Sequence, residues 1–181
     1  MVFGWYDLDM TNAEKIEINH ESEEIPPWNM HKIEQMAGSY FIDALTSPRY
    51  RKTNSPKVSG DYHELAKQGD KLLSRIIVKW RKEQGNGKAT REKIGDLNFV
   101  SAKELCPVAI ELEIDKVLRM TRPERAQYHK IDVDRKAHKK FITEPLEALV
   151  AAINLYSGYE AAEQFVRDTI IVIILRIRNH Q

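Results

Sequence analysis

The last forty residues, Phe141 to Gln181, constrain the fold most, because apolar side chains are densest there and recur at helical spacing. The recurring positions after Ser157 are Phe165, Val166, Thr169, Ile170, Ile173, Ile174 and Ile177. Ser157 followed three residues later by Glu160 has the spacing of a capping box, which predicts that a helix begins here. Between Thr169 and Leu175 the segment is apolar on every side. We therefore expect this helix to be enclosed by other helices or by a second subunit.

A second helix is expected to begin at Glu144-Pro145. Proline is tolerated in the first turn of a helix, and acidic side chains there complement the helix dipole. The link to the next helix is short, so the two helices should form an antiparallel αα-hairpin. The apolar run in the last helix is far shorter than the roughly 20 residues that span a membrane, so no membrane partner is expected.

Upstream, the sequence predicts a mainly α fold, a bundle of five to seven helices. Apolar stripes at helical spacing cover residues 30–45 and 62–83. Residues 46–61 hold two Ser-Pro steps and four basic side chains, which is typical of an exposed loop. Residues 1–28 are expected to form an irregular arm that could contain short strands. The predicted domain is therefore residues 29–181, with the loop at 46–61.

Composition narrows the function classes. The chain of 181 residues has 28 basic and 27 acidic side chains, a net charge of +1. This balance provides no global basic field, so nucleic acid is not indicated as a partner. The single cysteine suits a reducing compartment, and the first ten residues lack the pattern of a signal peptide. A cytoplasmic location is expected.

One stretch, residues 76–105, resembles a death domain. Ile76-Ile77 is followed by Trp80-Arg81-Lys82, then Gly85 and Ala89-Thr90, as in the region between the fourth and fifth helices of that family. The resemblance implies a helical bundle without a catalytic site that assembles signalling complexes through charged surfaces. The interaction surface expected on this basis combines the end of the helix with the basic loop; its residues are Arg49, Arg51, Lys52, Trp80, Arg81 and Lys82.

A competing resemblance covers residues 141–175. Glu144 and Glu147, three apart, are similar to the Glu-x-x-Glu helix of the all-α MazG-like nucleoside triphosphate pyrophosphohydrolases. The resemblance implies Mg²⁺ held by Glu144, Glu147, Glu163 and Asp168. Clustered carboxylates suit that chemistry because Mg²⁺ prefers oxygen ligands. The second acidic pair departs from the family pattern, since Phe165 stands three residues before Asp168.

Weighing the two, we predict a helical protein–protein interaction module, an adaptor or accessory subunit, with no catalytic residues and no cofactor. Its expected partners are another protein and a second copy of the chain, bound through the C-terminal helix. The alternative function is a Mg²⁺-dependent nucleoside triphosphate pyrophosphohydrolase that uses the four carboxylates.

Overall fold

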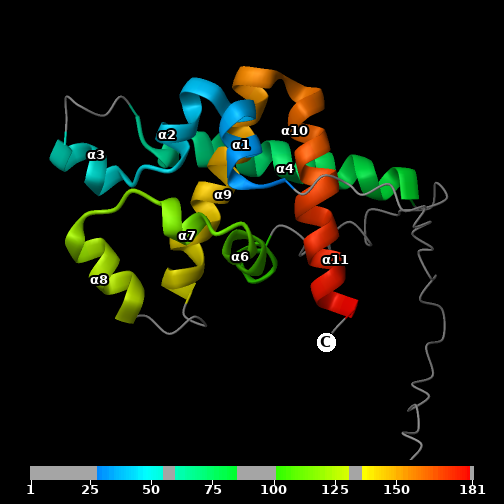
Figure 1. Ribbon diagram of the computed structural model, residues 1–181. Coiled ribbons are helices and arrows are strands. Elements are labelled where there is room, and N and C mark those ends of the chain that lie inside the picture. The colour runs from blue at the N-terminus through cyan, green and yellow to red at the C-terminus, as the bar shows by residue number, and fades with distance from the viewer. Residues whose placement is uncertain (1–27, 55–59, 85–100, 131–135, 180–181) are drawn as a thin grey trace, which may run out of the picture.

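The computed structural model describes residues 28–54, 60–84, 101–130 and 136–179, and these residues are mainly helical, as predicted (Figure 1). The helices are α1 Met30–Ala37, the 3₁₀ turn η1 Gly38–Tyr40, α2 Phe41–Ala44, α3 Pro48–Asn54, α4 Tyr62–Gln84, α6 Ala102–Glu111, α7 Ile114–Val117, α8 Arg122–Lys130, α9 Lys136–Ser157, α10 Tyr159–Phe165, the π-helical segment η3 Val166–Ile171 and α11 Val172–Asn179. Apart from Trp28, the N-terminal arm predicted at 1–28 lies outside the described residues, and the predicted domain limits stay a prediction.

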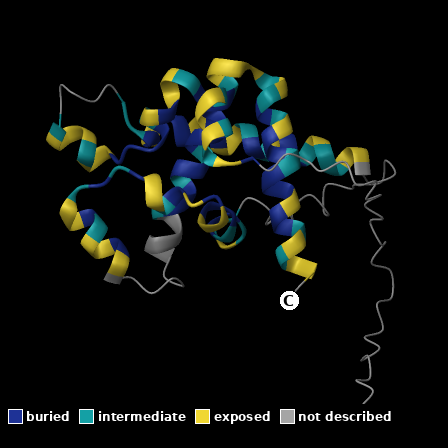
Figure 2. Ribbon diagram, viewed as in Figure 1, coloured by how far each residue is buried: buried dark blue, intermediate teal, exposed yellow. Residues whose placement is uncertain are grey.

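The two long helices α4 and α9 cross at the centre of the molecule, where Figure 2 shows the buried residues gathered. Both present apolar side chains at helical spacing to this crossing. The innermost are Leu73, Ile76 and Ile77 of α4, and Leu146, Leu149 and Ile153 of α9, all fully buried. Gly69 allows the close approach, because a Cβ built there would overlap the carbonyl oxygen of Glu147. The prediction of a helix over 62–83 is confirmed.

The prediction that a helix begins at Glu144 is wrong. Helix α9 begins at Lys136 and continues through Pro145, which is buried inside it. Proline removes one intrahelical hydrogen bond, so its preference for a first turn suggested a start. Here the packing of Leu146 and Leu149 in the core holds the helix together across that position.

The capping box predicted at Ser157 is also absent. The Ser157 hydroxyl donates instead to the carbonyl oxygen of Met36 at 2.8 Å, which ties the end of α9 to α1. Gly158 occupies the N-cap position of α10 with φ 89°, a conformation that favours glycine. The two helices still pack against each other across this tight link.

The apolar segment at residues 169–175 is packed against helices of its own chain. This was one of the two predicted alternatives, the other being a second subunit. Ile170, Ile171, Ile173 and Ile174 are buried, and η3 and α11 pack on α4 and α6. Just before this segment, the ring of Phe165 lies 5.0 Å from that of Trp28. Val172, however, is 42% exposed, so burial is not complete around the helix.

Helix α3 lies in the segment that was predicted to be a loop. The Ser47 hydroxyl accepts a hydrogen bond from the Tyr50 backbone N–H at 3.0 Å, and Pro48 takes the first helical position. The apolar stripe over 30–45 is divided rather than continuous. Gly38, with φ 50°, ends α1 and leaves room for the Tyr156 ring, which a Cβ would overlap.

Candidate active site

A surface pocket of about 330 Å³ lies between α4 and α9, beside their crossing. Eight residues line it: His63, Ala66, Lys67, Asp70, Ala102, Thr143, Glu144 and Glu147. Three of these carry carboxylates and two carry groups that can be cationic. The pocket therefore brings together acidic and basic side chains from two different helices.

Helix geometry explains this grouping. On α4 the lining residues follow the spacing i, i+3, i+4 and i+7, which places them along one face. On α9, Glu144 and Glu147 are three apart and share a face in the same way. Gly69 lies directly before Asp70 and packs against the Glu147 backbone. The closest point of the crossing thus sits next to the carboxylates of both helices.

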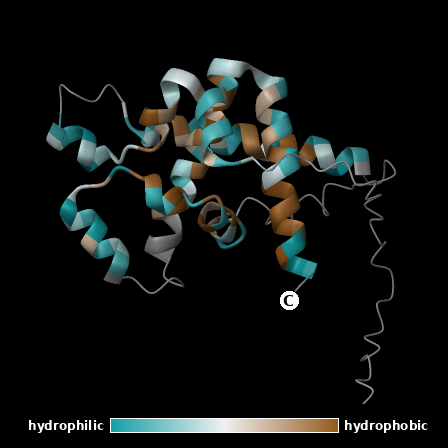
Figure 3. Cartoon of the chain, viewed as in Figure 1, coloured by the Kyte–Doolittle hydropathy of each residue, from teal (hydrophilic) through white to brown (hydrophobic). Residues whose placement is uncertain are grey.

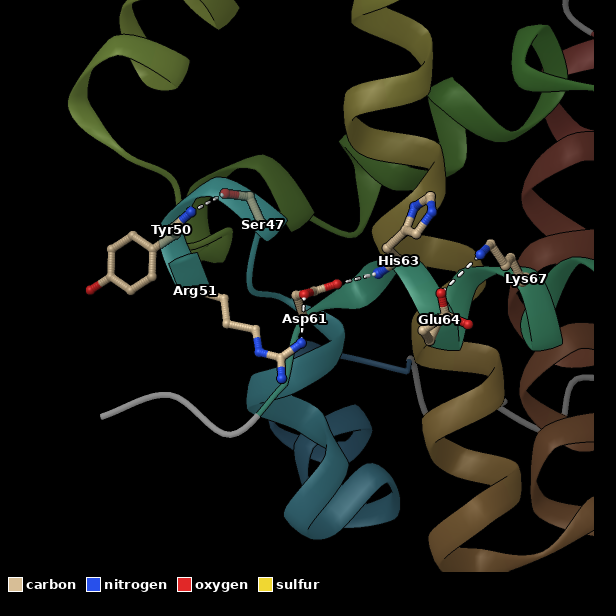
Figure 4. Close-up of polar contacts among 7 residues, drawn as sticks. All are labelled: Ser47, Tyr50, Arg51, Asp61, His63, Glu64 and Lys67. Carbon is tan, nitrogen blue, oxygen red and sulfur yellow. Dashed lines mark hydrogen bonds and ion pairs between the residues drawn. The ribbon is translucent and has the colours of Figure 1, made fainter. Parts of the chain in front are cut away.

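The basic side of the pocket is formed by the first two turns of α4 (Figure 4). The His63 backbone N–H donates to Asp61 at 3.0 Å, which fixes the start of the helix. Lys67 Nζ donates to Glu64 at 2.8 Å, and both side chains are well exposed. An exposed pair of this kind contributes little, so Lys67 can exchange Glu64 for another anion at small cost.

A buried phenol lies next to the pocket on α4. Tyr62 precedes the pocket on α4 and is 5% exposed. Its pKa is raised well above the ordinary value, first by burial and then by the negative charges of Glu144 and Glu124. Glu144 therefore lies within electrostatic reach of Tyr62.

The donor chemistry suits Mg²⁺, although the side chains do not form a ready-made cage. Among the described residues, no three His, Cys, Asp or Glu side chains stand close enough to hold a metal ion together. Mg²⁺ is commonly bound through one or two carboxylates, with waters and substrate phosphates completing its shell. Asp70, Glu144 and Glu147 fit that mode, in which the substrate supplies part of the coordination.

The structure separates the four carboxylates that the sequence grouped as metal ligands. Glu144 and Glu147 line the pocket. Glu163 lies on α10 and accepts from Lys79 at 2.8 Å and from Arg167, which lowers its pKa. Asp168 is on η3 and does not line the pocket.

Asp70 was missed because sequence reasoning looked for two carboxylates three apart on one helix. A usable signal was present one residue earlier: a glycine inside a strongly amphipathic helix marks close approach of another backbone. Gly69 predicts the crossing, and Asp70 follows it.

The interaction surface proposed from the sequence does not form one surface. Arg49, Arg51 and Lys52 lie on α3, near the beginning of α4, whereas Trp80, Arg81 and Lys82 lie at its end. Helix α4 has 23 residues, so its two ends are about 34 Å apart. Trp80 also packs partly against the core.

The fold and the pocket define an all-α domain that gathers carboxylates from two crossing helices. The chain belongs to the family described as ribonuclease-III-like, which matches residues 40–174. It is 28% identical to "Ribonuclease 3" of Wolbachia pipientis over 128 residues, 68% of this chain and 52% of that protein. It is 27% identical to "Ribonuclease 3" of Mycoplasmopsis synoviae over 145 residues, 77% of this chain and 57% of that protein. The chain thus spans about half the length of these relatives.

Solved structures share the fold. The nuclease domain of ribonuclease III from Campylobacter jejuni superposes with a TM-score of 0.64 at 21% identity, covering 78% of this chain and 96% of that one. A second structure of the same domain gives a TM-score of 0.60 at 20% identity, covering 86% and 99%.

These comparisons overturn five expectations. The resemblances to death domains and to MazG-like pyrophosphohydrolases are both wrong, and so are the adaptor function and its pyrophosphohydrolase alternative. The resemblance over 76–105 was carried by the end of an amphipathic helix, and residues 85–100 of that stretch lie outside the described residues. The view that nucleic acid is not indicated conflicts with membership of a ribonuclease family. No helix among the described residues is long and apolar enough to cross a membrane.

Proposed function

We propose that this chain hydrolyses phosphodiester bonds of RNA at the pocket between α4 and α9. The observation that carries the proposal is the convergence of Asp70, Glu144 and Glu147 on one pocket, in a chain of the ribonuclease-III-like family. The named activity of the relatives supports RNA as the substrate class. A cytoplasmic location stays a prediction.

The residues of the pocket suit the requirements of phosphodiester hydrolysis. A water molecule must be oriented and deprotonated, and the developing negative charge must be stabilised. Carboxylates can accept the proton, and one or two of Asp70, Glu144 and Glu147 would hold Mg²⁺ together with waters and substrate phosphates. The cation, when bound, would supply charge stabilisation and a more acidic water. Lys67 adds a positive charge to the lining of the pocket, and His63 lines it as well.

The test is cleavage of end-labelled RNA, double-stranded and single-stranded, with Mg²⁺ and with a chelator. We expect Asp70→Asn and Glu147→Gln each to lower kcat by on the order of 10²–10⁴. The matched control is Glu34→Gln, which neutralises an exposed carboxylate on α1, away from the pocket. Its rate should equal that of the wild type.

A second readout separates loss of chemistry from loss of fold. Mg²⁺ should raise the thermal unfolding temperature of the wild type, because binding to the folded state alone stabilises it. That rise should shrink in Asp70→Asn and Glu147→Gln. If folded wild type cleaves neither RNA, the proposal fails. Full activity in both pocket variants would mean that the reaction occurs elsewhere.

We also propose that the chain forms a homodimer. The described surface exposes a group of large apolar side chains where η1 and α2 meet the end of α9: Tyr40, Ile42, Leu155 and Tyr156. A hollow of about 260 Å³ lies on α4 and α9, with Leu72 and Ala151 in its lining. A second copy could bury these side chains symmetrically. Support comes from the C. jejuni nuclease domain, which shows structural flexibility in a region involved in dimer formation.

A further inference from the structure

Positive charge is concentrated at one end of the molecule. Residues 47–54 and 119–129, which we call the basic fork, comprise α3, most of α8 and the residues that precede each helix. They contain six arginine or lysine side chains and one acidic residue, Glu124. The rest of the chain then has 22 basic and 26 acidic residues. The near-neutral total therefore conceals a strongly basic surface.

Apart from Arg51, which pairs with Asp61, the cations of the fork form no ion pair with a described residue. Arg49 and Lys52 on α3 and Arg122 on α8 are exposed. The acidic residue, Glu124, is 3% exposed and accepts hydrogen bonds inside the protein. Figure 3 shows both helices as hydrophilic. The outer surface of the fork is therefore cationic.

The two helices of the fork are held together by buried polar contacts. Glu124 Oε2 accepts from the Ser47 hydroxyl at 2.9 Å and from both the N–H and the hydroxyl of Thr121 at 2.8 Å. The Ser47 N–H donates to the Arg119 carbonyl oxygen at 2.9 Å. The Arg119 guanidinium lies 5.1 Å from the centre of the Tyr50 ring. These contacts join the bases of α3 and α8, so their charges keep a defined spacing.

The fork is connected to the start of α4, where the lining of the pocket begins. Arg51 on α3 pairs with Asp61 at 3.1 Å, and Asp61 accepts from the N–H of His63, which lines the pocket (Figure 4). Lys67 lines the pocket one turn further along α4. The two contacts of Asp61 fix α3 against the start of α4, whose first turns line the pocket.

We propose that the basic fork binds the sugar–phosphate backbone of the RNA whose neighbouring phosphodiester enters the pocket. The inference rests on the proposed function for the identity of the polyanion. A backbone presents phosphates at regular spacing, and fixed cations on two helices match such a ligand through charge rather than base identity. Arg49, Lys52 and Arg122 are the contacts that position the strand.

The experiment measures the affinity of the full chain for an RNA duplex as a function of salt, in the Glu147→Gln background and with a chelator, so that cleavage does not interfere. Each phosphate contact contributes about one unit to the slope of log K against log salt. Arg49→Gln/Arg122→Gln removes one exposed cation from each helix and should lower the slope by about 2. Affinity at low salt should fall about tenfold or more, equally for duplexes of unrelated sequence. The matched control, Lys82→Gln/Lys103→Gln, removes two exposed cations from α4 and α6 and should leave the slope unchanged.

The outcomes distinguish this inference from the proposed function. If RNA is bound with the expected slope but wild type does not cleave it, the fork stands and the function fails. If RNA is cleaved while the fork variant keeps the wild-type slope and KM, only the fork is overturned. Equal losses of RNA affinity in the fork and control variants would show that RNA is attracted by diffuse charge and not by the fork. RNA binding that is independent of salt would also overturn the inference. So would binding of an acidic protein by a chain that does not bind RNA. Unfolding temperatures within a few degrees of wild type confirm that the exposed substitutions leave the fold intact.

Discussion

Gly69 is the residue at which α4 and α9 come into backbone contact, and it lies next to Asp70. Alanine is the better helix former, by about 1 kcal/mol. At this position its methyl group would overlap the Glu147 carbonyl oxygen, so the helices must separate. We expect Gly69→Ala to lower the free energy of unfolding by about 1–3 kcal/mol, measured by urea denaturation. Gln68→Ala, exposed on the same helix, should stay within about 0.5 kcal/mol of wild type. Equal stability of the two variants would contradict a contact at Gly69.

The same substitution tests the pocket. Separating α4 from α9 moves Asp70 away from Glu144 and Glu147, so RNA cleavage should fall together with stability. A variant that loses stability but cleaves RNA at the wild-type rate would show that the crossing does not set the geometry of the carboxylates.

Tyr62 makes stability depend on alkaline pH. Its pKa is raised in the folded state by burial and by Glu144 and Glu124, so folding favours the neutral phenol. The unfolded chain loses this proton near pH 10, and its ionisation pulls the equilibrium toward unfolding. The stabilisation is fully present below about pH 9 and is lost as the pH rises beyond about 10. Urea midpoints measured from pH 8 to 11 should fall less steeply for Tyr62→Phe than for wild type. Urea midpoints that fall equally steeply in both proteins would show that Tyr62 does not cause the loss of stability at alkaline pH.

At the scale of single elements, two neighbouring residues of α11 differ sharply in how far they are buried. Ile173 is 6% exposed, whereas Val172 is 42% exposed. Ile173→Asp places an unpaired charge in the core and should cost about 3–5 kcal/mol, a large share of a typical domain's stability. Val172→Asp is the control and should remain folded. Circular dichroism with thermal unfolding makes the comparison. A stable, monodisperse Ile173→Asp protein would mean that α11 does not pack as described.

The elements also show what the sequence could predict. Helix α4 and the buried C-terminal segment were predictable because their apolar periodicity is long and strong. Helix boundaries were not, because local signals were outweighed by packing: Pro145 lies inside α9, and the Ser157 hydroxyl is used by α1. Helix α3 depends on Ser47, whose partner Glu124 is 77 residues away in the chain.

Only part of the candidate site could be predicted from the sequence, because the rest depends on how distant helices pack. Glu144 and Glu147 lie on one helix, so their spacing alone places them together. Asp70 joins them only through the crossing of α4 and α9, for which Gly69 is the one local signal. Glu163 has a suitable spacing in the sequence, yet Lys79 and Arg167 bind its carboxylate.

At the scale of the whole molecule, substitutions of the exposed apolar side chains test whether the chain is a dimer. Ile42 and Leu155 are 46% and 44% exposed, while the C-terminal helix offers chiefly Val172. Sedimentation equilibrium should give twice the chain mass of 21.0 kDa for wild type. Because a symmetric interface contains each substituted residue twice, Ile42→Glu or Leu155→Glu places two carboxylates in it and should yield folded monomers. Val172→Asp should remain dimeric. The reverse result, with only Val172→Asp dissociating, would assign the interface to the C-terminal helix, and a monomeric wild type at high concentration would remove the dimer altogether.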